Sequence, residues 1–420
     1  MIVYTYIKAF MAGTAVLVCA SALAETPDAL VKQALQRNPE LNFFVAEIAA
    51  AKGALRTAGT RRNPELSSEV GYKNSRDNSG GTTGDGAIVA LSLSQTFEYP
   101  GRIALRKAIA NHDIALAELH LQQFRLTLAA RVRTLAYGIS SAQQKSAAAR
   151  QVAARFQALS AVLAQRPTAG VTPQLEARII DANTLAFRRQ EREAELTIIK
   201  AFTELNQLCG RPANAPLKIA AGNVRFSGAS LPRLLTAARA NAFDIRIRQV
   251  EFALQGIKVA LSKNERFPAF SVGPFYSMEN AIDREQRAGL GISLPLPLWD
   301  RNLGNIATSK ARQQQAEASL AITEREVERR VAQNAAILTA KHTEIDNLEG
   351  DELAKFREAA ETADRNYQLG AVPLTIYVET QKQYLELVST LTELQKEALQ
   401  AAQDLEILTG LKLYGEGAQP

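Results

Sequence analysis

Side chains that could act as nucleophiles, proton carriers or metal ligands are scarce in this 420-residue chain, which has three His, two Cys and three Met residues. His112 and His120 lie in a helical pattern at a spacing that sets them about 80° apart around the helix axis, so they do not share one face. A metal site or a Cys/His catalytic pair needs several such groups close together. The sequence contains no phosphate-binding glycine loop and no dinucleotide-binding glycine pattern. We therefore expect no enzyme activity, no cofactor and no metal site.

The overall composition is that of a folded protein, with 46% hydrophobic and 22% charged residues. The formal net charge of +6 is spread along the chain in short, interleaved acidic and basic groups. A nucleic-acid-binding surface would concentrate Lys and Arg in one patch. We therefore expect no nucleic-acid partner.

The N-terminal segment has the features of a secretory signal peptide. Lys8 precedes an apolar run over 9–20, and small residues follow at 22–24. The apolar run is shorter than the roughly 20 residues that a membrane-spanning helix needs. We predict a signal peptide at 1–24 and a mature chain at 25–420.

Acylation at Cys19 is the alternative for this segment, although Val18 stands where a lipoprotein signal normally has a small residue. After cleavage, Cys209 would be the only thiol of the mature chain. An internal disulfide is then impossible, so stability must come from packing or oligomerisation.

The chain repeats itself at an offset of about 200 residues. Four landmarks recur in the same order: Asn38-Pro-Glu-Leu41 with Asn241-Ala-Phe-Asp244, Asn63-Pro64 with Phe267-Pro268, Gly170-Val-Thr-Pro173 with Gly370-Ala-Val-Pro373, and Leu205-Asn-Gln-Leu-Cys-Gly210 with Leu405-Glu-Ile-Leu-Thr-Gly410. Such agreement indicates a duplicated unit, with repeats at about 25–210 and 230–410.

Each repeat contains two segments in which apolar and polar residues alternate, as in β-strands with one apolar face. The predicted hairpins cover about 65–98 and 269–297, with polar connections at 75–86 and 280–286. Pro274 cannot donate a ladder hydrogen bond and is expected to weaken its strand. Strands of about 10 residues are long enough to cross an outer membrane when tilted, and an ordinary soluble sheet is the alternative.

Helical patterns fill the rest of each repeat. They predict amphipathic helices at 28–62 and 232–266, long helices at 102–164 and 303–367, and shorter helices at 173–208 and 374–408. The long helices would extend about 95 Å, more than a globular core accommodates. If each shorter helix stacks end to end with the first helix of its repeat, the combined length of the two matches the length of the long helix. The apolar spacing is typical of close-packed coiled helices.

Four strands cannot close a barrel, and open sheet edges in lipid would leave backbone groups unpaired. We therefore expect the chain to associate. Three copies would give twelve strands around an aqueous lumen, and the helices would continue it as a tube of about 100 Å into the periplasm. The predicted fold is mainly α with membrane β-structure: a duplicated unit with four barrel strands per protomer in a twelve-stranded trimeric barrel, and a long periplasmic coiled-coil helical tube.

Over essentially the whole mature chain, the sequence resembles the TolC-like outer-membrane efflux proteins. Three motifs carry the resemblance: Gln95-Thr-Phe-Glu-Tyr-Pro-Gly-Arg102, Leu294-Pro-Leu-Pro-Leu-Trp-Asp-Arg-Asn-Leu-Gly-Asn-Ile306 and Tyr367-Gln-Leu-Gly370. The Asp300-Arg-Asn-Leu-Gly-Asn305 form is similar to the CzcC-like branch, the outer components of cobalt-zinc-cadmium resistance systems. Drug-efflux relatives tend to have a Gly-Gly-Arg variant there.

The resemblance implies a homotrimeric channel in the outer membrane of a Gram-negative cell, extending into the periplasm. Such a channel docks to a periplasmic adaptor (membrane fusion) protein and an inner-membrane resistance-nodulation-division pump, and performs no chemistry itself. The branch implies export of divalent heavy-metal cations. A duct for drugs or organic solutes is the alternative, and a periplasmic coiled-coil adaptor or scaffold is the alternative from another class.

The breaks at the far ends of the long helices, about 165–172 and 367–373, are expected to form the periplasmic tip. The candidates for adaptor docking are Gly170, Val171, Gly370 and Ala371. In the family, a tyrosine before the second turn and acidic residues on the next helix line the closed aperture, and Tyr367 and Glu379 match them. Val372 and Ile376 stand where well-known members have a basic lock residue and a second acid, so we expect no such lock.

Apolar residues on the predicted strands are candidates for contact with lipid: Leu91, Leu93, Leu290 and Ile292. Tyr99 and Trp299 follow the strand ends, where an aromatic belt would lie at the membrane interface.

Overall fold

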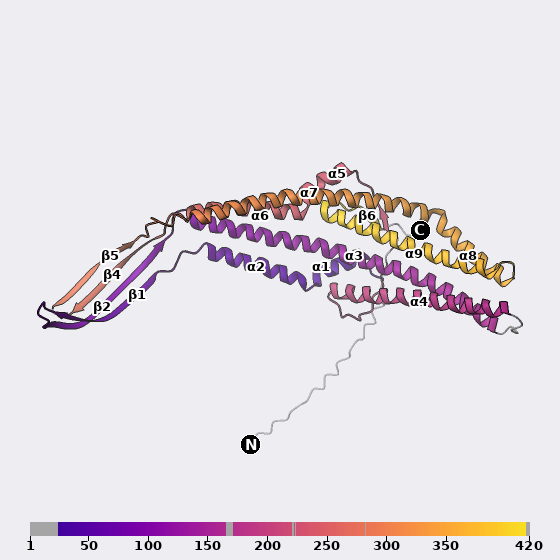
Figure 1. Ribbon diagram of the computed structural model, residues 1–420, viewed down its shortest axis with the longest axis horizontal. Coiled ribbons are helices and arrows are strands. Elements are labelled where there is room, and N and C mark those ends of the chain that lie inside the picture. The colour runs from indigo at the N-terminus through magenta and orange to yellow at the C-terminus, as the bar shows by residue number, and fades with distance from the viewer. Residues whose placement is uncertain (1–23, 165–170, 221, 223, 282, 417–420) are drawn as a thin grey trace, which may run out of the picture.

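The computed structural model describes residues 24–164, 171–220, 222, 224–281 and 283–416. The molecule is elongated, with a four-stranded sheet at one end and helices that run from the sheet to the opposite end (Figure 1). The predicted leader up to residue 23, with Cys19, and the greater part of the first predicted turn, with Gly170, lie outside the described residues.

In the first repeat, helices α1 (Pro27–Arg37) and α2 (Glu40–Ala58) precede the hairpin, and α3 (Arg102–Ala164) and α4 (Val171–Leu208) follow it. The bounds of α3 coincide with the predicted 102–164. The prediction of one helix over 28–62 is wrong, because the chain leaves helical geometry at Asn38, directly before a proline. Asn38 Oδ1 accepts the first backbone N–H of α2 at 2.8 Å.

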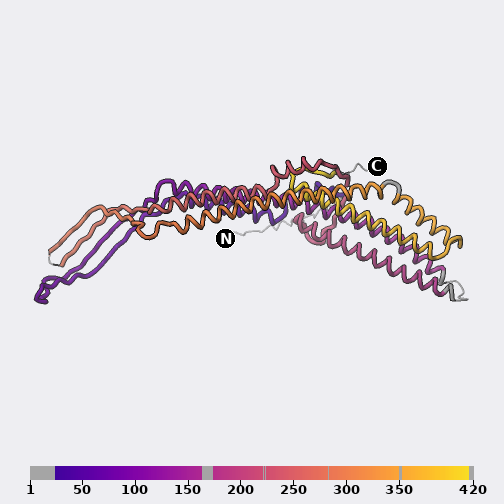
Figure 2. Tube along the Cα trace, turned by 45° about the horizontal axis from the view of Figure 1, so that its top comes forward, coloured from indigo at the N-terminus to yellow at the C-terminus, as the bar shows by residue number. Residues whose placement is uncertain are grey.

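The second repeat contains α5 (Leu231–Asn241), α6 (Phe243–Asn264), α7 (Leu303–Asn347), the π-helix η1 (Leu348–Glu352), α8 (Leu353–Gln368) and α9 (Leu374–Thr409). The predicted helix over 232–266 is also divided, by extended backbone at Ala242. The predicted helix over 303–367 is interrupted by η1. A π-helix adds a residue to one helical turn, which bends the helix. The chain accordingly changes direction between α7 and α8 (Figure 2).

Equivalent contacts in the two repeats show that the unit is duplicated. Asn38 Nδ2 donates to the Leu208 carbonyl at the end of α4 at 3.2 Å, and Asn241 Nδ2 donates to the Thr409 carbonyl at the end of α9 at 2.9 Å. The glycines that follow these helices, Gly210 and Gly410, both have a positive φ. In the first repeat α4 therefore continues the line of α1 and α2 beside α3, and in the second repeat α9 continues the line of α6 beside α7, with α5 packed to the side (Figure 1).

The strands of the two hairpins form one antiparallel sheet in the order β1 (Glu65–Arg76), β2 (Thr82–Phe97), β4 (Phe270–Asn280), β5 (Arg284–Ser293). The β2–β4 ladder joins the repeats, with Ser92 opposite Phe275 and Gln95 opposite Val272. Among the described residues, no strand pairs with the outer edge of β1 or of β5. This sheet, the duplication and the long helices confirm the predicted fold class.

The first hairpin is longer than predicted. Its strands continue to the pair Arg76 and Thr82, so the predicted connection at 75–86 is wrong for most of its length. The turn is short because Asp77 Oδ1 accepts the backbone N–H groups of Ser79 and Gly81, at 3.0 and 2.8 Å.

The strand β4 runs through Pro274, but its ladder with β2 has a gap at Gly273 and Pro274, as the missing proline N–H requires. The strand β5 ends at Ser293, before the predicted end of its hairpin, because Pro295 and Pro297 have no N–H to offer a ladder.

A small second sheet, which the sequence did not predict, pairs β3 (Val224–Phe226) with β6 (Tyr414–Glu416). It ties the linker between the repeats to the end of the chain. The buried apolar residues form three clusters: one in the first repeat around Val132 and Leu205, one in the second around Val331 and Leu405, and one near the helix ends around Phe156.

Candidate functional site

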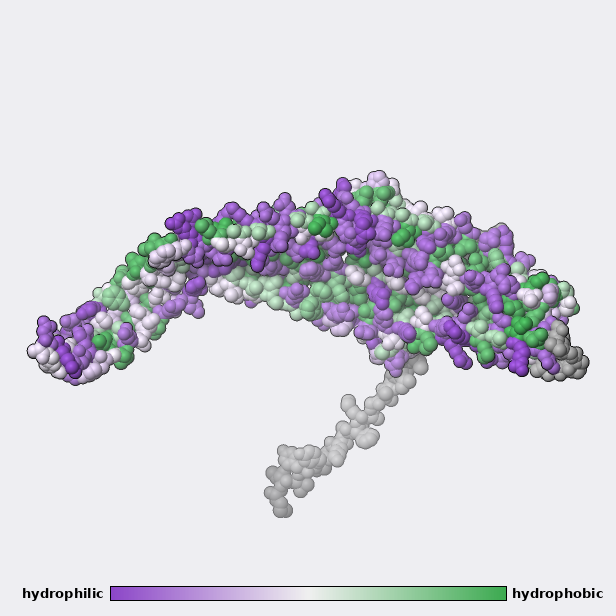
Figure 3. All heavy atoms as spheres, in the orientation of Figure 1, coloured by the Kyte–Doolittle hydropathy of each residue, from purple (hydrophilic) through white to green (hydrophobic). Residues whose placement is uncertain are grey.

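The sheet has one apolar face, and the four predicted lipid-facing residues lie on it. Leu91 pairs with Tyr276, which pairs with Ala288, so these three side chains share a face. Because strand side chains alternate, Leu93 lies on this face too, as do Leu290 and Ile292. The leucines at 91 and 93 are each 44% exposed, and Leu290 and Ile292 are each 75% exposed. Hydrophobic residues are visible along the sheet between its hydrophilic far end and the helices (Figure 3).

The opposite face of the sheet is polar. Thr96 and Ser271 share a hydrogen bond of 3.0 Å across the β2–β4 ladder. Lys73 of β1 and Glu279 of β4 form an ion pair on the same face. A sheet with this division separates an apolar environment from an aqueous one.

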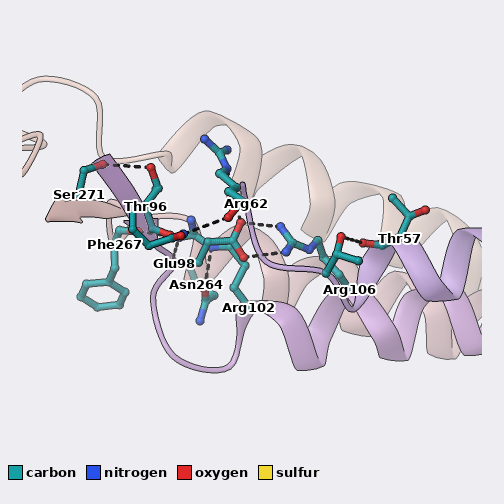
Figure 4. Close-up of polar contacts among 11 residues, drawn as sticks. Thr57, Arg62, Thr96, Glu98, Arg102, Arg106, Asn264, Phe267 and Ser271 are labelled. Atoms are coloured by element: carbon teal, nitrogen blue, oxygen red, sulfur yellow. Dashed lines mark hydrogen bonds and ion pairs between the residues drawn. The ribbon is translucent and has the colours of Figure 1, made fainter. Parts of the chain in front are cut away.

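The strands join the helices through a cluster of polar contacts, shown in Figure 4. The Glu98 side chain, 7% exposed, accepts two hydrogen bonds of 2.7 Å from the Arg106 guanidinium. Arg62 lies 3.9 Å from the same carboxylate. The predicted motif at 95–102 therefore fixes the start of α3 against the end of β2.

Arg102, the last residue of that motif, ties the first repeat to the second. Its guanidinium donates to Asn264 Oδ1 at 3.0 Å and to the carbonyls of Asn264 and Phe267 at 3.1 and 2.6 Å. Asn264 Nδ2 donates in return to the Pro100 carbonyl at 2.9 Å. The positive charge lies at the C-terminus of α6, where the helix dipole favours a cation.

The motif at 300–305 plays the equivalent part in the second repeat. Asn302 has a left-handed backbone with φ 57°, and its Nδ2 donates to the Ser262 carbonyl of α6 at 2.8 Å. Asp300 Oδ1 accepts the Asn302 N–H at 2.8 Å. These residues set the start of α7 against α6.

At the opposite end of the molecule, the second predicted tip turn follows α8. Gly370 has a φ of +74°, a conformation that costs a residue with a side chain about 1–2 kcal/mol. The N–H of Gly370 donates to the Tyr367 carbonyl, and that of Ala371 donates to the Asn366 carbonyl, which closes the end of α8. Gly370 and Ala371 are exposed. Val171 is the first residue of α4, and its predicted companion Gly170 is not described.

Near this tip, four aromatic rings lie in a row, one from each of four helices; we call this row the aromatic stack, although its Phe156–Phe187 pair meets edge to face. Phe187 of α4 contacts Phe156 of α3, Phe156 contacts Tyr377 of α9, and Tyr377 contacts Tyr367 of α8. Each pair has ring centroids 5.0 Å apart. Phe156 and Tyr377 have no exposed surface. The stack joins the α3–α4 pair to the α8–α9 pair.

Polar groups accompany the stack. Gln381 is fully buried and donates from Nε2 to the Ala360 carbonyl at 2.6 Å. Burial, with the nearby Asp364 carboxylate, raises the pKa of the Tyr377 hydroxyl, so this group stays neutral. In the described part of the chain that hydroxyl has no hydrogen-bond partner.

The structure does not bring the two predicted aperture residues together within one protomer. The Tyr367 ring is half-buried against Tyr377. Glu379 is exposed two residues farther along α9, about 200° around the helix from Tyr377, and accepts a hydrogen bond from Gln383 at 3.0 Å. It faces a recess between α9 and α4 that Ile179 and Asn183 also line.

Sequence reasoning missed the aromatic stack. Phe156, Phe187 and Tyr377 each follow the ordinary apolar spacing of a helix, and nothing in a single sequence indicates that rings about 30 to 220 residues apart are neighbours. A close pair of aromatic residues around a turn, such as Tyr367 and Tyr377, was the one available signal.

Within the described residues, no group of three or more His, Cys, Asp or Glu side chains is arranged to hold a metal ion. Of the helices described, none combines the length and apolar character that a bilayer span requires. Cys209 is fully buried, and burial raises the pKa of its thiol, so the group is a poor nucleophile.

Comparison with known proteins agrees with this geometry. The family model for outer membrane efflux proteins matches residues 30–211 and 234–411, one segment in each repeat. The chain is 24% identical over 409 residues to the pyoverdine export outer membrane protein OpmQ of Pseudomonas aeruginosa, covering 89% of this chain and 83% of OpmQ.

Solved structures of the same architecture include CusC and Vibrio cholerae VceC. The CusC match has a TM-score of 0.70 at 17% identity and covers 92% of each chain. The VceC match has a TM-score of 0.69 at 17% identity and covers 91% of this chain and 96% of VceC. Because the family model matches both repeats, and the sheet, long helices and duplication all agree with it, the chain belongs to the outer membrane efflux protein family.

Proposed function

We propose that this outer-membrane protein is the trimeric exit duct of a tripartite efflux pump. The observation that carries the proposal is the sheet with one apolar face and two edges, β1 and β5, with which no described strand pairs. Neighbouring strands of the sheet run in opposite directions, so β1 and β5 at its two edges are antiparallel to each other. The β5 strand of one copy can therefore pair antiparallel with β1 of the next. Three copies then close a ring of twelve strands, which removes every open edge.

In such a ring the apolar face meets lipid and the polar face lines the lumen. Leu91, Leu93, Leu290 and Ile292 would contact the hydrocarbon, where an Arg or Lys costs about 2–4 kcal/mol at the midplane. Lys73 and Glu279 would line the aqueous path. The helices would continue that path into the periplasm.

The tip opposite the sheet is the proposed docking site for the adaptor, which connects the duct to a resistance-nodulation-division pump. Gly170, Val171, Gly370 and Ala371 are its candidate contacts. The exposed left-handed turn at Gly370 and the exposed Ala371 support this proposal, because both present backbone to a partner.

Tyr367 and Glu379 are the proposed aperture residues. Three copies of Glu379 around the pore axis would favour cations. We expect Glu379→Gln to lower the cation-over-anion permeability ratio by about twofold in planar bilayers. Glu386→Gln is the control, since Glu386 is exposed on the same helix about two turns farther from the tip. Equal ratios for Glu379→Gln and wild type would exclude the ring.

For the cargo, we propose divalent heavy-metal cations. The support is the similarity of the 300–305 motif to the CzcC-like branch. That motif positions α7 against α6, so it supports the proposal by likeness of sequence and not by contact with cargo. Organic solutes are the second candidate, favoured by the relative OpmQ, whose name gives pyoverdine export.

Growth of a deletion strain decides between the two cargoes. We expect hypersensitivity to one or more of zinc, cobalt, cadmium, nickel and copper, with normal growth on dyes and antibiotics and rescue by the wild-type gene. Sensitivity to organic compounds with normal metal tolerance would contradict the metal proposal and leave the duct intact.

A further inference from the structure

A recess lies at the base of the sheet in each repeat, where strands give way to helices. The first, of about 260 Å³, is lined by Arg61, Arg62 and residues 96–101. The second, of about 400 Å³, is lined by Arg266, by the segment around Trp299 and by Asn302 at the start of α7. Arg62 and Arg266 both stand two residues before the proline that recurs in the repeats, so the duplication placed an arginine in each recess.

The surrounding surface, which we call the collar, comprises residues 59–65, 98–107, 263–268 and 294–304. It contains eight Lys and Arg residues and four Asp and Glu residues. Of the acids, Glu98 is already neutralised by Arg106. Five cations are exposed and form no ion pair or side-chain hydrogen bond with any described residue: Arg61, Lys107, Lys263, Arg266 and Arg301. The collar therefore carries uncompensated positive charge.

Large apolar side chains are exposed among these cations. Trp299 is 93% exposed, and Leu296 and Leu298 are 67% and 62% exposed. Pro295 and Pro297 have no N–H to donate, and the Leu298 N–H donates to the Leu296 carbonyl at 2.8 Å, so the segment turns at Pro297 with both leucines exposed. Exposed tryptophan beside arginine is typical of the boundary between hydrocarbon and head groups, because each side chain has an apolar part and a polar end.

The collar also presents the start of a long helix. Asn302 precedes α7 in a left-handed conformation, and its Oδ1 accepts a hydrogen bond from the Asn305 side chain at 2.6 Å and none from a backbone N–H of the first turn. The N–H groups of that turn therefore lack a side-chain acceptor, and the positive end of the helix dipole adds to the charge of Arg301. Glu265 and Asp300 lower the charge of the second recess, and Arg301, which adjoins the recess without lining it, offsets one of these two acids.

We propose that the collar binds the phosphodiester head groups of anionic phospholipids in the periplasmic leaflet of the outer membrane. Arg61 holds a head group at the first recess, and Arg266 and Arg301 hold one at the second. Trp299 inserts beside the upper acyl chains. Ile292 is the last residue of β5 on the apolar face of the sheet, and the collar segment 294–304 begins two residues later. The collar therefore lies at the edge of the hydrocarbon. This inference depends on the outer-membrane location and not on the cargo.

Trp299 is the only tryptophan of the chain, so its fluorescence reports on the collar alone. The full chain is reconstituted in phosphatidylcholine vesicles that contain either brominated phosphatidylglycerol or brominated phosphatidylcholine at the same mole fraction. We expect blue-shifted emission and at least about twofold stronger quenching by the brominated phosphatidylglycerol. In the triple variant Arg61→Gln, Arg266→Gln, Arg301→Gln, the two lipids should quench equally.

Two controls separate charge from folding. Lysine at the same three positions keeps the charge and should keep the preference. Glutamine at Arg178, Arg192 and Arg357, exposed cations on helices far from the sheet, should also leave it unchanged. The proposal is overturned if Trp299 is not quenched in the bilayer, if wild type shows no preference for phosphatidylglycerol, or if the glutamine collar variant retains the preference.

Discussion

Adding one methyl group at position 273 is expected to prevent assembly of the sheet, whereas the same change at position 291 is expected to be tolerated. A Cβ built on Gly273 would lie 1.6 Å from the Leu93 carbonyl oxygen and 2.7 Å from its carbon, both of them backbone atoms of β2. Backbone cannot rotate away as a side chain can, so the two strands must separate. This is the ladder that joins the repeats, and its loss would divide the barrel wall in each protomer.

We expect Gly273→Ala to destabilise the sheet by about 4 kcal/mol or more, because a clash with buried backbone is one of the few causes of such a large loss of stability from a single substitution. Gly291→Ala is the matched control. Gly291 pairs directly with Gly273, but its Cβ would meet the nearest atom at 3.8 Å, an ordinary contact. The measurement is the yield of folded oligomer after extraction from outer membranes. A Gly273→Ala protein that assembles as well as the Gly291→Ala protein would show that the strands are not this close.

Truncating Phe156 is expected to loosen the tip while leaving the rest of the molecule folded. Phe156 is fully buried at the centre of the four-ring stack, between Phe187 and Tyr377. Loss of a buried Phe side chain costs about 3–5 kcal/mol through lost burial and the cavity that remains. The cost falls on the contact between the α3–α4 pair and the α8–α9 pair, so both pairs should separate more readily near their ends.

Hydrogen exchange resolved by segment measures this effect. For Phe156→Ala we expect faster exchange in α8 and in the first turns of α9, with α6 and the adjoining part of α7 unchanged. Tyr377→Phe is the control: it keeps the ring and removes a buried hydroxyl that lacks a hydrogen-bond partner among the described residues, so the change should stay below about 1 kcal/mol. Equal exchange in Phe156→Ala and wild type would mean that the stack does not hold the helix pairs together.

Periodicity and repetition were sufficient to predict the main architecture. The α3 helix over 102–164 has a continuous apolar pattern between a proline-glycine junction and the next break, so its bounds could be read from the residues. The offset of about 200 residues predicted equivalent contacts, and Asn38 and Asn241 make them at the ends of α4 and α9.

Features that depend on tertiary contact or on a single turn could not be predicted. The π-helix at Leu348–Glu352 has no sequence pattern of its own. It adds one residue to a single helical turn, and the apolar spacing of the long helix is too irregular to reveal one added residue. The three-residue strands β3 and β6 are too short for alternation to be recognised. The longer first hairpin follows from the Asp77 turn, which is decided by hydrogen bonds and not by hydropathy.

The same division applies to the candidate sites. Alternation placed Leu91, Leu93, Leu290 and Ile292 on one face, because a strand has only two faces to choose from. For the candidate aperture residues Tyr367 and Glu379, the resemblance to the TolC-like family indicated only their positions along the chain. Their orientation depends on how α8 packs on α9, which only the three-dimensional structure supplies.

The most direct test of the central claim is the mass of the assembly. The mature protein, extracted from outer membranes in mild detergent, is measured intact by native mass spectrometry. Our account predicts three copies, because the open edges of β1 and β5 are all paired when twelve strands close. A monomer or dimer, or a protein that stays in solution as a monomer without detergent, would contradict it.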